Sequence, residues 1–181
     1  MKVFLMLADG FEETEALVPW DVLRRAGADI KLVSVSNTKA VSGAHGLSLT
    51  ADTTIENVGS ELPDCFVLPG GMPGMTNLLA CGPLCDMLIR ASSCGKVLAA
   101  ICASPSVLGE LGILNGRNAV CFPGFESRLK GARISEDSVC RDGNVLTGKG
   151  MGVAFEFAFA LTEMLFGKSV SEKLKKEVQY K

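Results

Sequence analysis

The sequence predicts an α/β protein in which a mostly parallel sheet is covered by helices on both faces. Strand-like and helix-like patterns alternate along the chain with short links, the order that parallel sheets require. The run at residues 97–101 is apolar throughout, as expected for a strand buried on both faces. The 181 residues contain no internal repeat, low-complexity segment or linker, so we expect one domain over residues 1–181.

The N-terminal third predicts two strands with a helix between them. Residues 3–8 are apolar and predict the first strand, and residues 30–35 predict the second. A helical face begins in the acidic stretch 12–15 and ends before Gly27, a residue type that commonly follows helices. Pro19 lies inside this face, so the helix either kinks there or effectively starts near it.

The middle of the chain predicts a hairpin, two buried strands and a helix. Weak alternation around glycines over residues 41–49 favours the hairpin. Residues 64–68 form a short buried strand that ends at Pro69-Gly70-Gly71, and a helical segment follows Gly82-Pro83. The strand at 97–101 comes next.

The C-terminal part predicts a short strand at 119–121 and a helical patch that ends near Leu129. A hairpin is expected over residues 139–146, where an Asp-Gly pair between apolar runs favours a type I′ turn. The last long helix runs from about 153 to 166 and is closed by Gly167.

Cys102 follows the strand at 97–101 directly. Ser104-Pro105 then offers an N-cap and a proline at the first helical position. A strand that becomes a helix within three residues holds the cysteine on a sharp turn, as in a nucleophile elbow. Ligands collect at the carboxyl ends of strands in open α/β sheets. We therefore predict that Cys102 is the reactive centre.

A reactive Cys102 needs a partner that stabilises its thiolate. A free thiol has a pKa near ~8.5, and a helix N-terminus supplies at most ~2 kcal/mol of the roughly 4 kcal/mol that a three-unit shift requires. A protonated carboxylic acid could provide the second hydrogen bond, and Glu12, Glu13 and Glu15 are candidates that spacing does not separate. The alternative is a solvated first helical turn. His45, the single histidine, is most simply a loop residue in the glycine-rich hairpin.

Other motifs carry weaker predictions. Gly70-Gly71 offers backbone N–H groups for an oxyanion hole, or else a tight turn. Residues 148–152 match neither phosphate-binding glycine motif, so we predict no cofactor. Cys81 and Cys85 are interrupted by Gly-Pro and lack a nearby histidine, so we predict no metal. The remaining cysteines are expected in the core or as bystanders: Cys65, Cys94, Cys121 and Cys140.

Composition excludes several function classes. A formal charge of −2 with scattered Lys and Arg gives no footprint for nucleic acid or a membrane surface, and no apolar run approaches a membrane span. The apolar N-terminal segment is too short for a signal peptide. Seven cysteines without framework spacing suit a reducing compartment, so we expect a cytoplasmic protein.

Three motifs together identify a family resemblance: Asp-Gly-Phe-Glu-Glu-Thr-Glu at 9–15, Leu-Pro-Gly-Gly at 68–71 and Ala-Ala-Ile-Cys-Ala at 99–103. The chain resembles the ThiJ/PfpI superfamily nearly end to end, in its DJ-one branch. The resemblance implies a flavodoxin-like sandwich and a homodimer. It also implies that Cys102 is the elbow cysteine, that protonated Glu15 hydrogen-bonds its sulfur, and that backbone N–H groups of Gly71 and Ala103 face the site.

Two positions depart from the family pattern. Phe122 stands where close relatives place a histidine beside the cysteine, which puts protease activity in doubt. His45 stands where some relatives carry an anion-binding arginine.

The resemblance implies cofactor-free detoxification of dicarbonyls such as methylglyoxal and glyoxal (a glyoxalase III-type activity), or repair of glycated protein, through Cys102 and Glu15. The alternative is an oxidative-stress sensor or redox-regulated chaperone that acts through oxidation of Cys102. An amidase or protease comes third.

Overall fold

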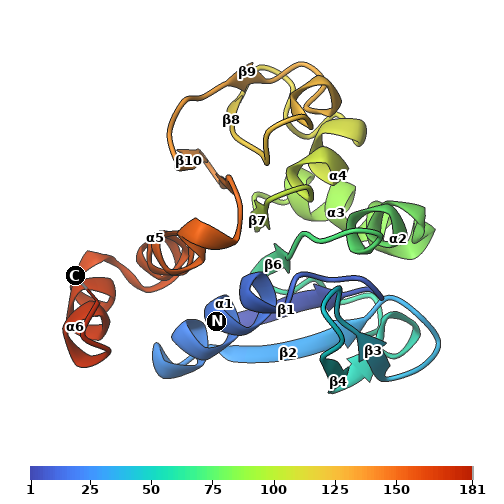
Figure 1. Ribbon diagram of the computed structural model, residues 1–181, viewed down its shortest axis with the longest axis horizontal. Coiled ribbons are helices and arrows are strands. Elements are labelled where there is room, and N and C mark those ends of the chain that lie inside the picture. Colours follow the sequence, from blue (N-terminus) through green and yellow to red (C-terminus); the bar gives the residue numbers. More distant parts are fainter. Residues whose placement is uncertain (181) are drawn as a thin grey trace.

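The computed structural model describes residues 1–180 and contains a seven-stranded sheet in the order β10-β11-β7-β6-β1-β2-β5 (Figure 1). All neighbouring strands are parallel except β10 and β11, which form an antiparallel hairpin at one edge. The strands of this sheet are β1 (Lys2–Leu7), β2 (Asp29–Ser34), β5 (Thr53–Thr54), β6 (Cys65–Leu68), β7 (Val97–Ile101), β10 (Val139–Asp142) and β11 (Val145–Gly148). The predicted α/β class and mostly parallel sheet are confirmed.

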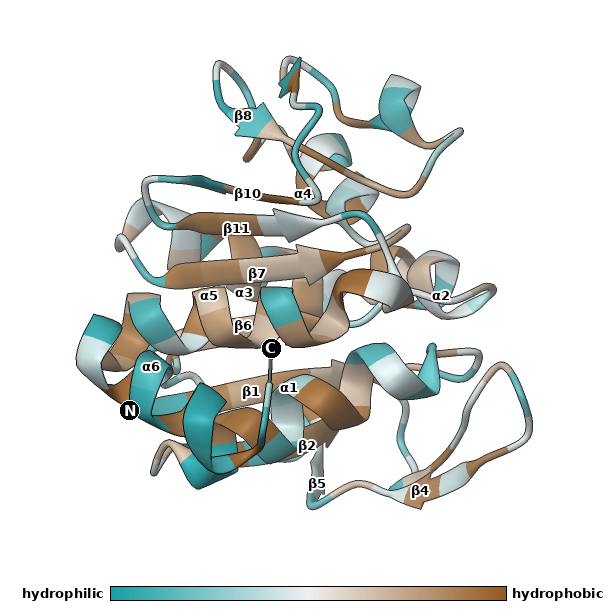
Figure 2. Ribbon diagram, turned by 60° about the vertical axis from the view of Figure 1, so that its left-hand side comes forward, coloured by the Kyte–Doolittle hydropathy of each residue, from teal (hydrophilic) through white to brown (hydrophobic). Residues whose placement is uncertain are grey.

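Helices cover both faces of this sheet, because successive side chains of β1 point alternately into two buried cores. Val3, Leu5 and Leu7 point into a core formed with the first and fifth helices, while Phe4 and Met6 point into the opposite core. The side of Val3 carries α1 (Glu13–Arg25), α5 (Ala154–Phe166) and, outside them, α6 (Lys168–Glu177). The opposite side carries α2 (Gly74–Ala80), α3 (Gly82–Ser93) and α4 (Pro105–Glu110). Figure 2 shows the hydrophobic strands enclosed between these layers.

Smaller elements lie outside the main sheet. The hairpin predicted over 41–49 is present as β3 (Ala40–Ser42) and β4 (Ser48–Thr50). The strand predicted at 119–121 is shorter and begins one residue earlier, as β8 (Asn118–Ala119). It is not part of the main sheet but pairs with β9 (Arg133–Ile134) in a separate two-stranded sheet. Three 3₁₀ turns complete the set: η1 (Ile55–Asn57), η2 (Glu126–Arg128) and η3 (Met151–Val153).

Several local predictions need correction. The first helix begins at Glu13 and runs through Pro19, so it does not start near the proline. In the second hairpin only Gly143 of the two loop residues has a positive φ, which fits a type II′ turn, and the predicted type I′ turn is wrong. Helices α2 and α6 were not expected from the sequence. No helix among the described residues is long and apolar enough to cross a membrane.

Candidate active site

Cys102 sits on the turn between β7 and α4 with a φ of +65°, a left-handed conformation that is rare outside glycine. Such a residue costs roughly 1–3 kcal/mol and persists only when its surroundings hold it. Here the Cys102 N–H donates to the carbonyl of Gly148 at 2.9 Å, and its own carbonyl accepts the N–H of Phe122 at 2.8 Å. The sulfur is thereby fixed at the carboxyl end of the sheet.

Ser104 does not cap α4 in the predicted way. Its backbone is already helical, and its hydroxyl donates to the carbonyl of Pro69 at 2.7 Å. The bond joins the Cys102 turn to the turn after β6, because Pro69 directly precedes Gly70-Gly71. The predicted position of Ser104 at the helix start is correct, but its side chain connects two turns instead.

Glu15 lies in the first turn of α1 and is fully buried. Its Oε2 atom accepts the N–H of Gly70 at 2.8 Å, whereas its Oε1 atom has no hydrogen-bond partner. Burial raises the pKa of Glu15 to about 7, although the Gly70 N–H and the Cys102 thiol oppose this shift. The nearby Glu12 charge raises it further. A substantial fraction of Glu15 is therefore protonated at neutral pH.

Cys102 and Glu15 titrate as a coupled pair. Burial, the charge of Glu15 and the hydrogen bond with Glu15 raise the pKa of Cys102 to about 12, while the backbone N–H groups of Gly71 and Ala103 lower it. A charged Glu15 thus opposes the thiolate that the sequence led us to expect. The pair consequently holds at most one negative charge around neutral pH.

The glycines after β6 are required by close packing. A Cβ on Gly70 would lie 2.6 Å from the Cβ of Cys102 and 2.8 Å from Oε2 of Glu15. Gly71 has a φ of +91° and packs on the backbone of Gly10 and Glu12. Gly71 therefore makes the predicted tight turn, and its N–H interacts with the Cys102 sulfur, while the oxyanion hole stays a prediction.

The three glutamates of the acidic stretch have different surroundings. Only Glu15 reaches Cys102. The Oε1 atom of Glu12 accepts the N–H of Thr14 at 3.3 Å at the start of α1. Glu13 accepts the backbone N–H of His45 at 2.7 Å, and its second oxygen lies 2.8 Å from Nδ1 of the same residue.

His45 is therefore more than a loop residue, because it ties the β3–β4 hairpin to α1. Its Nδ1 also lies 3.2 Å from Glu12, and hydrogen bonding and attraction to Glu13 raise the pKa of His45. Glu12, Glu13 and His45 are the one group in the described residues whose donor atoms gather closely enough to hold a metal. These donor atoms already contact one another, and Cys81 and Cys85 belong to no such group.

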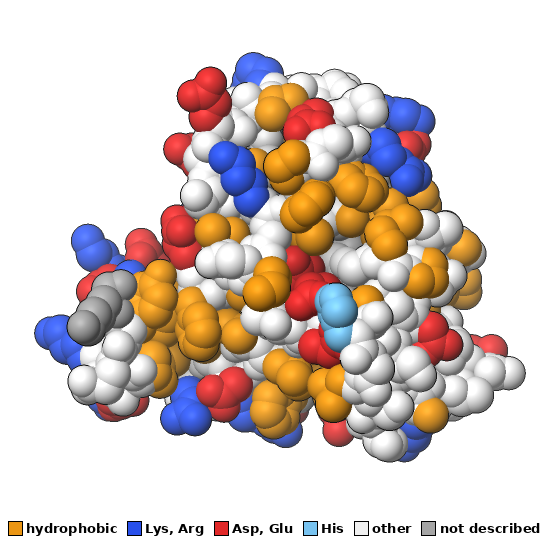
Figure 3. All heavy atoms as spheres, viewed as in Figure 1, with side chains coloured by type: hydrophobic (Ala, Val, Ile, Leu, Met, Phe, Trp, Pro, Cys, Tyr) orange, Lys and Arg blue, Asp and Glu red, His pale blue; other side chains and the backbone are white. Residues whose placement is uncertain are grey.

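Two shallow hollows flank the reactive pair and share Met151. One contains Glu12, Glu13, His45 and Leu47. The other is an apolar groove, which we define by Phe122, Pro123, Gly150, Met151 and Val153. Figure 3 shows the histidine over acidic side chains, with hydrophobic side chains on the surface beside them. Gly150 and Met151 were not predicted as site residues, since nothing in their local sequence points to the cysteine.

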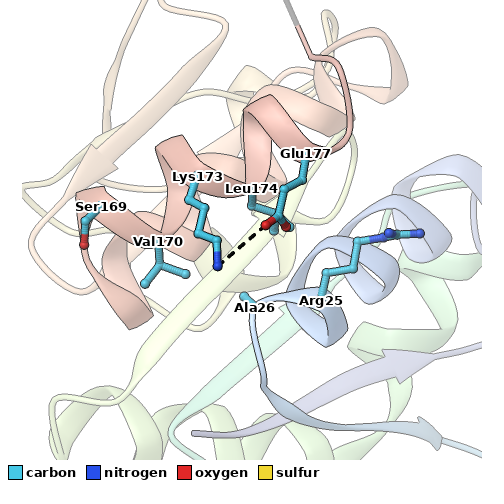
Figure 4. Close-up of a pocket in the computed structure, with 7 residues that line it drawn as sticks. All are labelled: Arg25, Ala26, Ser169, Val170, Lys173, Leu174 and Glu177. Atoms are coloured by element: carbon cyan, nitrogen blue, oxygen red, sulfur yellow. Dashed lines mark ion pairs between the residues drawn. The ribbon is translucent and has the colours of Figure 1, made fainter.

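A third hollow shares no residue with the other two and lies between the end of α1 and α6 (Figure 4). Arg25, Leu174 and an ion pair of Lys173 with Glu177 at 3.6 Å line it. None of the predicted site residues borders this hollow.

The fold and the Cys102 turn define a class: flavodoxin-like α/β proteins that present a cysteine on a strand-to-helix elbow. Within that class, a family model described as the DJ-1/PfpI family matches residues 1–164. The chain belongs to the DJ-1/PfpI family, as the motifs indicated.

Individual relatives agree with this assignment. The chain is 40% identical over 169 residues to protein DJ-1 homolog B of Arabidopsis thaliana, covering 92% of this chain and 39% of that protein. It therefore spans about two fifths of the length of this plant relative. A Caenorhabditis elegans relative named glutathione-independent glyoxalase DJR-1.2 is 32% identical over 176 residues, covering 96% of this chain and 93% of the relative. The structure of oxidized Toxoplasma gondii DJ-1 superposes with a TM-score of 0.95 at 38% identity, covering 99% and 98% of the two chains.

Proposed function

We propose that this protein is a cysteine-dependent enzyme that converts dicarbonyls such as methylglyoxal and glyoxal into 2-hydroxy acids without a cofactor. The observation that carries the proposal is the buried Glu15, whose unpartnered Oε1 belongs to a carboxyl group coupled to the Cys102 sulfur. A family member named as a glutathione-independent glyoxalase supports the same chemistry.

The first proton of the pair, in this proposal, leaves from Cys102 and not from Glu15. The backbone N–H groups of Gly71 and Ala103 interact with the Cys102 sulfur and favour a negative charge on it. Glu15 Oε1 has no donor of its own, so a negative charge on that oxygen is poorly compensated. Protonated Glu15 can then donate a hydrogen bond to the thiolate, and this bond supplies the stabilisation that the cysteine needs.

The reaction follows from this protonation state. The Cys102 thiolate adds to the aldehyde carbon, and the carbonyl oxygen takes the proton of Glu15, giving a hemithioacetal. The Glu15 carboxylate then removes the hydrogen of that carbon as a proton and returns it to the neighbouring carbon, while the hydroxyl proton of the hemithioacetal passes to the oxygen of that neighbouring carbon. The resulting thioester is hydrolysed by water to the 2-hydroxy acid and the free thiol. Overall the substrate gains one water, and no external oxidant or reductant is needed.

Deglycation would use the same residues, with an early glycation adduct on a protein or nucleotide as substrate. Deglycation is also expected when the enzyme removes only the free dicarbonyl, because early adducts exchange with it and are depleted as it is consumed.

A redox-sensor or redox-regulated chaperone role is the second candidate. Cys102 is partly exposed, and backbone N–H groups around it would hold the oxygens of a sulfinate. The Toxoplasma relative is itself an oxidized DJ-1 in its solved structure. An amidase or protease is less well supported, because Phe122 borders the site and His45 is engaged by Glu12 and Glu13.

Steady-state turnover tests the proposal. Purified protein treated with a chelator and freed of glutathione should produce lactate from methylglyoxal, detected by an enzyme-coupled or chromatographic assay. Absence of lactate above the uncatalysed rate would favour the sensor.

A further inference from the structure

We infer that the apolar groove receives the substituent of an α-oxoaldehyde, and that this protein favours substrates whose substituent is aromatic. The inference rests on the proposed function, because it names the substrate class for the same cysteine. It depends on three features: the absence of a side chain at Gly150, the exposed ring of Phe122, and the distribution of charge around Met151.

Gly150 joins the groove to the reactive pair. It is buried, and its φ of 165° and ψ of −172° are extended backbone, so conformational freedom does not demand a glycine there. A Cβ on Gly150 would lie 3.2 Å from the ring of Phe122 and 3.9 Å from Oε1 of Glu15. A side chain at position 150 would therefore crowd the aromatic ring and stand between it and the one unpartnered oxygen of the site.

Phe122 provides a positioned apolar surface beside Gly150. Its backbone N–H bonds the carbonyl of Cys102 at 2.8 Å, which fixes where the residue sits relative to the reactive cysteine. Its side chain is 47% exposed, although no other aromatic ring among the described residues is paired with it. An exposed ring in a groove that also contains Pro123, Met151 and Val153 is suited to contact a second aromatic group.

Charge around the site directs the substituent to this side. The hollow on the other side of Met151 contains Glu12, Glu13 and His45 beside Leu47, so charged groups face a substituent there. Lys149 also borders the groove, but its ammonium donates to the carbonyl of Glu136 at 2.7 Å. The groove therefore selects a neutral, apolar group on the carbonyl carbon next to the aldehyde that Cys102 attacks.

Comparing two substrates tests the inference. We expect kcat/KM for phenylglyoxal to exceed that for methylglyoxal by about tenfold or more, in line with the discrimination that apolar pockets achieve. Gly150→Ala places a methyl between the Phe122 ring and Oε1 of Glu15 and should reduce this ratio at least tenfold. Phe122→Leu, at an exposed position where folding is preserved, should also reduce it. Gly82→Ala is the control, because its added methyl meets no atom within 4 Å and Gly82 does not line the groove, so the ratio should stay unchanged.

A second measurement does not depend on turnover. Alkylation by 2-chloroacetophenone or chloroacetone joins the Cys102 sulfur to the reagent's methylene carbon and releases chloride. Peptide mass spectrometry compares the rates at Cys102 with those at exposed Cys94 in the same molecule. We expect a preference for the phenyl reagent at Cys102 alone, lost in Gly150→Ala.

The two measurements separate the two proposals. Preferential phenyl alkylation without turnover of either aldehyde would support the groove and contradict the proposed enzyme. Turnover of methylglyoxal without a phenyl preference in either measurement would overturn the groove and leave the enzyme proposal standing.

Discussion

The backbone N–H of Gly70 donates to Oε2 of Glu15 at 2.8 Å and thereby orients a buried carboxyl group whose Oε1 atom has no hydrogen-bond partner. One oxygen is used for positioning, and the other is left free. Because Gly70 also packs against the Cβ of Cys102, one turn sets the positions of both members of the pair.

Substitution of the pair should stop catalysis. Cys102→Ser should abolish lactate formation from methylglyoxal, because an alkoxide is far less accessible than a thiolate at neutral pH. Glu15→Gln should lower kcat by about 10²–10⁴-fold, the usual contribution of general acid–base catalysis, since an amide cannot carry the proton between carbons. Wild-type turnover in Glu15→Gln would disprove the proton shuttle even if Cys102 proves essential.

Thiolate absorbance against pH should identify which group ionises first. We expect the wild type to show a thiolate with a midpoint at or below about pH 7, and Glu15→Gln to show a higher midpoint because an amide is the weaker donor. If Glu15 ionises first instead, the wild type would show no thiolate below about pH 8, near the value of a free thiol. Glu15→Gln would then lower the midpoint by removing the carboxylate charge.

Stability should decrease as pH rises through the window set by Glu15. Burial raises its pKa from 4.5 to about 7, so between these values the folded state binds more protons than the unfolded state. The free energy of unfolding therefore falls as pH rises from 4.5 to about 7, by about 3 kcal/mol if the whole shift is realised. Urea denaturation of wild type and Glu15→Gln across this range should show the slope reduced in the variant. Equal slopes would assign the pH dependence to other groups.

Gly70→Ala should damage the site more than the fold. The added Cβ meets Cys102 and Glu15 at distances that real atoms do not adopt, so both side chains must move. We expect at least a hundredfold loss of kcat/KM and a destabilisation of about 1–3 kcal/mol, measured by turnover and urea denaturation. Gly82→Ala, where a Cβ meets nothing within 4 Å, should change neither quantity substantially. Full activity in Gly70→Ala would show that the pair tolerates displacement.

The family resemblance predicts a homodimer that uses the first helix. Val18 and Trp20 are incompletely buried, and Arg24 lies over the Trp20 ring at 5.8 Å on the exposed side of α1. Sedimentation velocity at micromolar concentration should give about twice the chain mass of 19.1 kDa, and Trp20→Glu should shift the species toward monomer. A stable wild-type monomer would reject this assembly.

The sequence by itself determined the long buried strands, the elbow and the family, but not the short strands β5 and β9. Continuous apolar runs such as 97–101 have few alternatives to a doubly covered strand, and the change from strand to helix within three residues placed Cys102 at the sheet's carboxyl edge. Local rules were less reliable where tertiary contacts compete with them. Ser104 has the composition of an N-cap, yet its hydroxyl bonds Pro69 from another strand end.

The family resemblance pointed to Glu15, which spacing did not separate from Glu12 and Glu13, and only the tertiary structure shows why this acid meets the sulfur and what surrounds it. Glu12, Glu13 and Glu15 are equivalent by composition, but their directions at the start of α1 leave two partly buried beside His45 and one fully buried against Gly70. Gly150 is likewise ordinary in sequence, and its importance arises because the chain returns after β11 to within reach of Glu15 and Phe122. These neighbours are far apart along the chain. The sequence does not predict their contacts, because burial and contact are properties of the packed sheet and not of any local pattern.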